Sequence, residues 1–390
     1  MFYDKQPEAN REDYKKMLSI MGSLSNLFSD NDSPYLAYRV HENSFCKYME
    51  ADNLGREDCS ADAKKNKVGI GLKTWIGRDD QKVAEFGKLK KNYTGLTGIE
   101  LVKKIAEYRN ERIRITKNMH GIAEMIYHVV KREPGSMQIL ECAFDSIDIE
   151  KIKLLPKRGN INNTYFTDGR HTYHFSVSKN TLYMIFDDLE LLDTVEVDIM
   201  DDPFDFLMRL SKGAISLKDE SVGGANKEQL CLPLYSGKGE NKFVPLKSGL
   251  NQWNAAGRKR GPDELYIGYR AEDRERKPNF FPPRETSFKL HLPDGTDISA
   301  KVCQEADKNN PSIGKAIMSN PNKVLGKWLL RDVFELPENT LVTYEMLEKF
   351  GVDSVVFTKL GELEYSVDFA RLGTYERFYG GDADSEEKDE

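Results

Sequence analysis

An alternating stretch at residues 68–75 most constrains the fold of the first half of the chain. Side chains alternate between the two faces of a strand, so this stretch predicts one apolar face and one face that leaves Lys73 beside an open surface. The apolar face comprises Val68, Ile70 and Leu72, and the other face comprises Gly69, Gly71, Lys73 and Trp75. Asp62 lies just upstream, where a hairpin through residues 64–67 would fold it back beside Lys73. The sequence therefore predicts an acid and a lysine on neighbouring strands.

Two further polar residues follow that strand at a spacing of four. Gln81 and Glu85 would share one face of a helix, and we expect that helix to turn both toward Asp62 and Lys73. Carboxylates suit hard, octahedral Mg²⁺, and a lysine can orient water or stabilise charge that develops on a phosphate. The pattern favours metal-dependent phosphodiester cleavage, with Asp62 and Glu85 as the metal ligands. A surface hairpin and helix with solvated charges is the alternative interpretation.

This arrangement resembles the PD-(D/E)XK nuclease superfamily, in which an Asp on one strand and an acid two residues before a Lys on the next hold Mg²⁺ against the scissile phosphate. Gly71 stands where that acid would be. The resemblance implies that Glu85, in a migrated position, takes over the metal contact, with Gln81 and Glu50 as the alternatives. Glu42, or again Glu50, resembles the additional acid that a preceding helix contributes.

A series of ordered blocks extends through the second half of the chain. The blocks are residues 232–236, 248–254, 258–260, 264–267, 280–283, 293–295, Gln304, 315–317, 325–331 and 365–369. This series resembles the pseudobarrel DNA-recognition domain at the C-terminus of phospholipase-D-type restriction enzymes and, more distantly, at the N-terminus of EcoRII-type enzymes and in plant transcription factors. The resemblance implies that this half binds double-stranded DNA.

The side chains of residues 251–260 suit a DNA groove. Amides can bond adenine edges, arginines can bond guanine or phosphate, and Trp253 can stack or wedge. Lysines and an arginine on a later segment could grip phosphates on the other side of the duplex. The complete set of predicted DNA-binding residues is Asn251, Gln252, Trp253, Asn254, Arg258, Arg260, Lys323, Lys327 and Arg331. A solvated basic loop is the alternative, and Trp328 is expected in the core.

The distribution of charge accommodates a DNA-binding function despite a formal net charge of −7. Residues 187–205 are acidic without a basic residue, and this stretch, with residues 212–226, is predicted to be the connection to the second domain. Residues 382–390 form an acidic tail that we expect to be disordered. The five cysteines lack zinc spacing, and no Walker-type loop indicates ATP use. The absence of a signal-like or membrane-spanning run favours a reducing, bacterial cytoplasm.

The expected architecture has two domains. We expect an α/β restriction-endonuclease-like domain over residues 1–210, a linker over 211–226, a mainly β pseudobarrel over 227–375, and the acidic tail over 376–390. Helical spacing occurs at residues 13–28, 95–112 and 121–131, and strand-like runs occur at 137–144, 164–167, 173–177 and 182–186. Asp168 and Gly169 predict a hairpin turn.

These expectations lead to a functional hypothesis. The sequence indicates a Mg²⁺-dependent type II restriction endonuclease that cleaves double-stranded DNA, acts as a homodimer, and has a cognate DNA methyltransferase in the same host. Two alternatives stay open. One is a non-catalytic, sequence-specific DNA-binding protein with a degenerate nuclease domain, and the other is a restriction endonuclease that requires methylated DNA.

Overall fold

The computed structural model describes residues 1–55, 59–77, 80–155, 162–212, 228–239, 241–308 and 310–380. It divides into two compact units. Unit 1 comprises Met1–Ile113 and Ile122–Gly223, and unit 2 comprises Arg114–Gly121 and Gly224–Glu390. The chain therefore enters unit 2 twice, because the last turns of one long helix belong to it.

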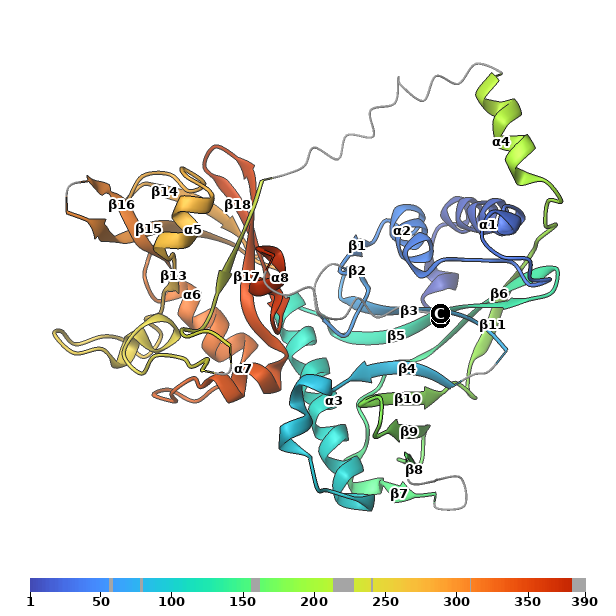
Figure 1. The fold of residues 1–390 in the computed structure, drawn as a ribbon, viewed down its shortest axis with the longest axis horizontal. Coiled ribbons are helices and arrows are strands. Elements are labelled where there is room, and N and C mark those ends of the chain that lie inside the picture. Colours follow the sequence, from blue (N-terminus) through green and yellow to red (C-terminus); the bar gives the residue numbers. More distant parts are fainter. Residues whose placement is uncertain are drawn as a thin grey trace. The chain divides into compact units, whose positions relative to one another are not determined.

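Unit 1 contains a six-stranded sheet that carries the candidate site (Figure 1). Its order is β1(Asp52–Asn53), β2(Ala63–Lys65), β3(Val68–Ile76), β5(Glu124–Glu133), β6(Ser136–Ala143) and β11(Glu190–Glu196). The pairing is antiparallel except between β3 and β5, which run parallel, and the crossover between them includes α3(Gly98–His120). The predicted strand at 68–75 and helix at 95–112 are confirmed.

A second sheet of unit 1 has five antiparallel strands. Their order is β4(Asp80–Glu85), β10(Thr181–Ile185), β9(Thr172–Ser176), β8(Asn163–Thr167) and β7(Lys153–Leu154). Buried residues from this sheet, from the six-stranded sheet and from α3 form one core. A second core lies between the other face of the six-stranded sheet and the helices α1(Glu8–Ser23) and α2(Tyr38–Tyr48).

Three predictions of secondary structure in unit 1 are wrong. The segment with Gln81 and Glu85 is not a helix but strand β4, because it pairs with β10 about a hundred residues later. Residues 124–133 form β5 rather than a helix. The middle of this strand, residues 127–130, is buried, and so short a buried run does not distinguish the helical from the strand period. The acidic stretch contains β11 and α4(Pro203–Lys212) rather than only a connection.

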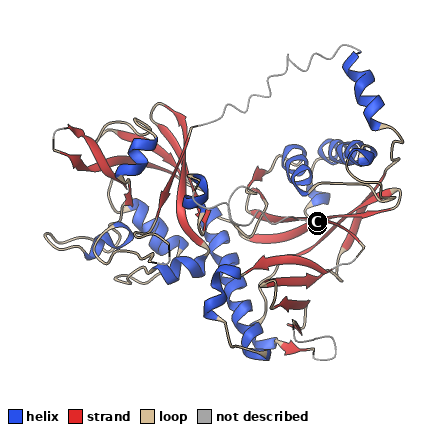
Figure 2. Ribbon diagram, viewed as in Figure 1, coloured by secondary structure: helices blue, strands red, loops and turns tan. Residues whose placement is uncertain are grey.

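Unit 2 is built on a seven-stranded, nearly closed sheet, with strands red and helices blue in Figure 2. Its order is β12(Gln229–Pro233), β17(Val352–Gly361), β18(Glu364–Arg371), β14(Ser287–His291), β15(Asp297–Asp307), β16(Asn310–Ser319) and β13(Ile267–Gly268). Only β14 and β18 pair in parallel. The two end strands, β12 and β13, also contact each other. This architecture agrees with the predicted mainly β pseudobarrel.

The helices of unit 2 are short and accompany a single core. They are α5(Ala271–Arg276), α6(Val324–Gly326), the π-helix Lys327–Val333, α7(Tyr344–Phe350) and α8(Thr374–Phe378). Ile115 and Met119, from the end of α3, join this core. Helix α8 occupies part of the predicted tail, and residues 381–390 lie outside the described residues.

Candidate functional site

The candidate site of unit 1 begins with Asp62, whose backbone bonds to β3 through its amide and to the residue after β1 through its carbonyl. The Asp62 amide donates to the Ile70 carbonyl at 2.8 Å, and the Leu54 amide donates to the Asp62 carbonyl at 2.9 Å. One carboxylate oxygen of Asp62, Oδ2, accepts a hydrogen bond from the Leu72 amide at 2.7 Å. The β2–β3 hairpin therefore fixes the carboxylate one residue from Lys73, as the sequence predicted.

Helix α2 supplies Glu42, whose exposed fraction is only 9 %. Glu42 Oε2 accepts from Arg39 Nη1 at 2.8 Å, and the same nitrogen lies 3.4 Å from the Gly55 carbonyl oxygen. A methyl group added at Gly55 would come within 3.0 Å of Glu42 Oε2, so the backbone there passes close against the carboxylate. Sequence reasoning missed Arg39, although its spacing of three from Glu42 is a helical pairing signal.

Helix α2 is itself positioned by a chain of buried hydrogen bonds. His41 Nε2 lies 3.0 Å from Tyr14 Oη, which lies 3.2 Å from His128 Nε2. The other ring nitrogen of His128, Nδ1, lies 3.0 Å from Glu141 Oε1. Burial lowers the pKa of His41 well below its usual value, which favours a neutral ring. These groups lock the helix that carries Glu42 to α1 and to the sheet.

Glu42, Asp62 and Lys73 form one electrostatic group. Burial raises the pKa of Asp62, while Lys73, the Leu72 amide and Arg39 lower it. Burial also raises the pKa of Glu42, the charge of Asp62 raises it further, and Arg39 and Lys73 lower it. The structure therefore brings together three of the predicted catalytic residues, from α2, from the segment before β2 and from β3.

The carboxylates of Asp62 and Glu42 could hold a Mg²⁺ ion that takes its other ligands from water and substrate phosphate. Within the described residues, no group of three or more His, Cys, Asp and Glu side chains forms a metal cluster. Two carboxylates are nevertheless what protein Mg²⁺ sites often supply, because this ion keeps several waters and takes further oxygens from substrate phosphates. Asp62 and Glu42 fit that requirement, and Lys73 adds a cation beside them.

The position of the missing acid is filled by an aromatic ring. A Cβ atom added at Gly71 would lie 2.8 Å from Cδ1 and 2.9 Å from Cε1 of Tyr127, and 3.0 Å from Phe144. The Tyr127 and Phe144 rings stack with centroids 4.0 Å apart, and Arg109 donates to Tyr127 Oη at 3.3 Å. A side chain at position 71 would therefore have to displace a ring that is held from two sides.

The proposed substitutes for that acid lie on other segments of the chain. Glu85 ends β4 of the five-stranded sheet, where its carboxylate lies 3.5 Å from Lys82 Nζ. Gln81 lies on the same strand, and Glu50 is largely exposed at 3.8 Å from Lys65. The helix that would have turned Glu85 toward the metal is a strand, so the geometric argument for Glu85 as a ligand is removed.

In unit 2, the residues predicted to read DNA separate into two kinds. Asn251 is fully buried, so its assignment as a base reader is wrong. Its Nδ2 donates to the carbonyls of Pro245 and Val342, and its Oδ1 accepts from the Val342 amide at 2.8 Å. Arg331 is likewise engaged with Asp263 and with backbone carbonyls. Both side chains hold loops together.

The other candidates are partly or wholly exposed. Arg260 donates to three carbonyls of its own loop, and Arg258 forms a two-pronged ion pair with the buried Glu264. Trp253 packs against the core, as does the buried Trp328. The remaining four residues show exposed or half-buried side chains at the surface of the unit; they are Gln252, Asn254, Lys323 and Lys327. These four, with Arg258, stay predicted DNA contacts.

Most of unit 2 is similar in sequence to a DNA-binding domain of restriction enzymes. Residues 225–361 match the family model of the NgoFVII C-terminal B3-like DNA-binding domain. Among curated proteins, none matches the chain. Within the part of the chain that the structure describes, no helix is both long and apolar enough to cross a membrane.

Proposed function

We propose that this protein is a Mg²⁺-dependent, site-specific endonuclease of double-stranded DNA, a type II restriction enzyme. Unit 1 cleaves and unit 2 recognises the DNA. The observation that carries the proposal is the group of Glu42, Asp62 and Lys73, in a chain that also carries a restriction-enzyme-type DNA-binding domain. Two carboxylates and a lysine are the groups that metal-assisted phosphodiester hydrolysis needs.

Each of the three side chains has a distinct role in this proposal. Asp62 and Glu42 bind the Mg²⁺ ion, which supplies Lewis-acid polarisation of the scissile phosphate when it is bound. Lys73 orients the attacking water and stabilises the negative charge that develops on the phosphate oxygens. Arg39 keeps the Glu42 carboxylate in place through its 2.8 Å contact. The raised pKa values of both acids mean that metal binding has to displace protons at low pH.

Cleavage of both strands requires two such sites, so the proposal includes a homodimer at least on DNA. It also includes a DNA methyltransferase in the same host that protects the host genome. The test is incubation of the purified protein with unmodified and with methylated phage DNA, each with Mg²⁺ and with EDTA. Discrete Mg²⁺-dependent fragments support the proposal, and fragments from methylated DNA alone identify a methylation-dependent enzyme.

A second candidate function is a non-catalytic, sequence-specific DNA-binding protein. The observation that favours it is Tyr127, whose ring fills the space beside Gly71 that an acid would need. Titration of Mn²⁺ in the presence of duplex DNA separates the two, with Asp62→Asn as the control variant. A specific gel shift without cleavage, together with Mn²⁺ binding that Asp62→Asn leaves unchanged, would establish the DNA-binding protein.

A further inference from the structure

A cavity of about 310 Å³ opens at the seam of the unit 2 sheet. The seam is the place where β12 and β13, the two ends of the strand order, contact each other. The end of β12 and the segment around β13 form opposite walls, and the loop at Ser248–Leu250 closes one side. The apolar part of the lining includes Leu234, Leu250 and Ile267. The cavity is therefore a gap left by incomplete closure of the barrel.

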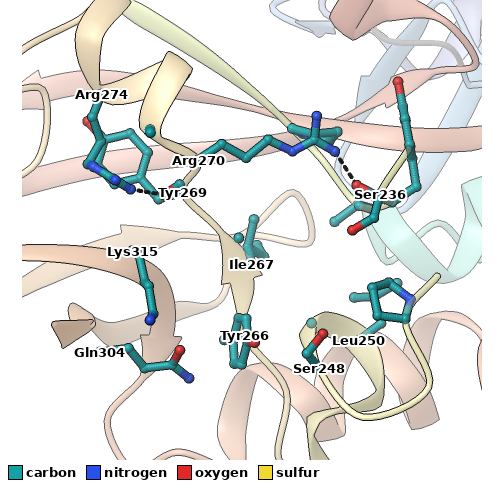
Figure 3. A pocket seen from close by; sticks show the side chains of 17 residues that line it. Ser236, Ser248, Leu250, Tyr266, Ile267, Tyr269, Arg270, Arg274, Gln304 and Lys315 are labelled. Atoms are coloured by element: carbon teal, nitrogen blue, oxygen red, sulfur yellow. Dashed lines mark hydrogen bonds between the residues drawn. The ribbon is translucent and has the colours of Figure 1, made fainter. Parts of the chain in front are cut away.

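The charge of the lining is one-sided. Arg270, Arg274 and Lys315 face the cavity, and none of the described lining residues is acidic. The guanidinium groups of Arg270 and Arg274 donate to the carbonyls of Tyr235 and Tyr269, which fixes them at the wall (Figure 3). Arg270 also lies 3.5 Å from Glu272, outside the lining, so its charge is partly balanced. The cavity favours an anionic group.

Lys315 is exposed and lies next to Gln304 in the cavity (Figure 3). Gln304 has a left-handed backbone, with φ of 57°, inside strand β15. The register between β15 and β16 shifts close by, between Glu305 and Asp307. β-Bulges and residues with strained backbones change the direction in which side chains point, and they are concentrated at functional sites. An amide can donate and accept hydrogen bonds, so Gln304 supplies the cavity with a group suited to the edge of a base.

Tyr266 provides the aromatic part of the wall. A cation, a paired donor and acceptor, an aromatic ring and an apolar floor together match the parts of a single nucleotide. The volume lies at the low end of the range of about 300–1,000 Å³ found for small-ligand sites, so a stacked base pair does not fit. Unit 2 carries a DNA-binding domain, and residues 248–250 adjoin the loop of predicted DNA contacts.

We propose that this cavity receives one nucleotide of the bound DNA, turned out of the duplex. Its phosphate lies beside Lys315 and Arg270, and its base lies against Tyr266 and the Gln304 amide. The inference rests on DNA binding by unit 2 and goes beyond the proposed cleavage. Turning a nucleotide out costs unstacking and unpairing energy, and this cost is smallest at a mismatch or an abasic site.

The test compares matched duplexes with duplexes of the same sequence that carry one central mismatch or abasic site. Fluorescence polarisation measures affinity, and 2-aminopurine placed at the mismatch reports unstacking. We expect the full-length protein to bind the mismatched duplex at least fivefold more tightly and to raise the 2-aminopurine signal. Gln304→Ala and Lys315→Ala should lose both effects. Lys349→Ala, an exposed lysine on α7, is the matched control and should keep them.

Lys315→Ala changes an exposed side chain and serves as the second variant if Gln304→Ala disturbs the strand. Equal affinity for matched and mismatched duplexes, or a preference that both cavity variants retain, would overturn the proposal. Cleavage of matched DNA with no mismatch preference refutes only the cavity, whereas binding to no duplex at all refutes DNA recognition as well. The two failures are therefore distinguishable.

Discussion

Substitution of Gly71 by Ala tests whether the space beside Lys73 is filled as the structure indicates. The added Cβ atom would lie 2.8 Å from a ring carbon of Tyr127, well inside van der Waals contact. Overpacking of this kind costs about 1–3 kcal/mol. Replacing a strand glycine by alanine returns about 0.5–1 kcal/mol through reduced backbone entropy. We therefore expect Gly71→Ala to lower the free energy of unfolding by about 0.5–2 kcal/mol.

A double-mutant cycle isolates the ring as the cause. In a Tyr127→Leu background the two nearest ring carbons are gone and the Phe144 ring carbon at 3.0 Å remains, so Gly71→Ala should stabilise the protein by at most about 0.5–1 kcal/mol. The coupling energy between the two positions should then be about 1–3 kcal/mol, measured by urea unfolding of all four variants. A coupling within about 0.5 kcal/mol of zero would refute the reasoning. It would mean that Tyr127 moves aside freely and that an acid could be installed at position 71.

Four further predictions concern the two units. The raised pKa of Asp62 means that its ionisation weakens the folded state, a loss that develops as the pH rises through the folded pKa. At neutral pH, Asp62→Asn should therefore have a higher urea midpoint of unfolding than the wild type. At a pH well below the pKa of Asp62 in the unfolded chain, this difference should disappear, and equal midpoints of the two proteins at all pH values would contradict the argument. Lys73→Ala should abolish Mg²⁺-dependent cleavage and retain the gel shift; cleavage at a near wild-type rate removes Lys73 from the mechanism. In a plasmid cleavage assay, Glu42→Gln should lose activity and Glu85→Gln should keep it. Loss of activity in Glu85→Gln but not in Glu42→Gln would instead support Glu85 as the metal ligand. Asn251→Ala should destabilise unit 2 by about 2–4 kcal/mol in thermal or urea unfolding, because it leaves backbone groups of Pro245 and Val342 without their hydrogen-bond partners. A variant of unchanged stability with altered DNA specificity would instead show that Asn251 contacts DNA bases.

The sequence predicted the part of the candidate site that depends on local structure. Alternation and a short hairpin were enough to place Asp62 beside Lys73, because Asp62 directly precedes β2 and Lys73 lies on β3 of one continuous hairpin. The predicted helix around Glu85 is wrong because this segment is a strand defined by pairing with β10, a partner distant in sequence. The helix predicted for residues 121–131 is wrong for a related reason, since the short buried run at residues 127–130 fits either a helical or a strand period.

Polar residues of unit 2 show a different limit of sequence reasoning. Asn251 and Arg258 lie in one stretch whose composition suits DNA contacts. Asn251, however, hydrogen-bonds to backbone groups, and Arg258 forms an ion pair with Glu264. Composition does not tell whether a side chain faces a ligand or a neighbouring loop. Conversely, Gln304 and Lys315 lie in separate strands with no common motif, and only the register of β15 and β16 brings them to one cavity.

If unit 1 binds Mg²⁺ as proposed, the ring of Tyr127 also limits the ligands that the protein can supply, because it fills the space beside Gly71. A nuclease of this kind with an acid at position 71 would present three carboxylates before DNA arrives, whereas Glu42 and Asp62 alone leave most positions around the ion to water. Both acids have a raised pKa, so they hold their protons to higher pH and bind metal less readily when free. Phosphate oxygens of the DNA would then complete the shell and supply much of the affinity. Metal binding should accordingly be coupled to DNA binding, which is why weak Mn²⁺ affinity of the free protein is no evidence against catalysis and the titration belongs in the presence of duplex DNA.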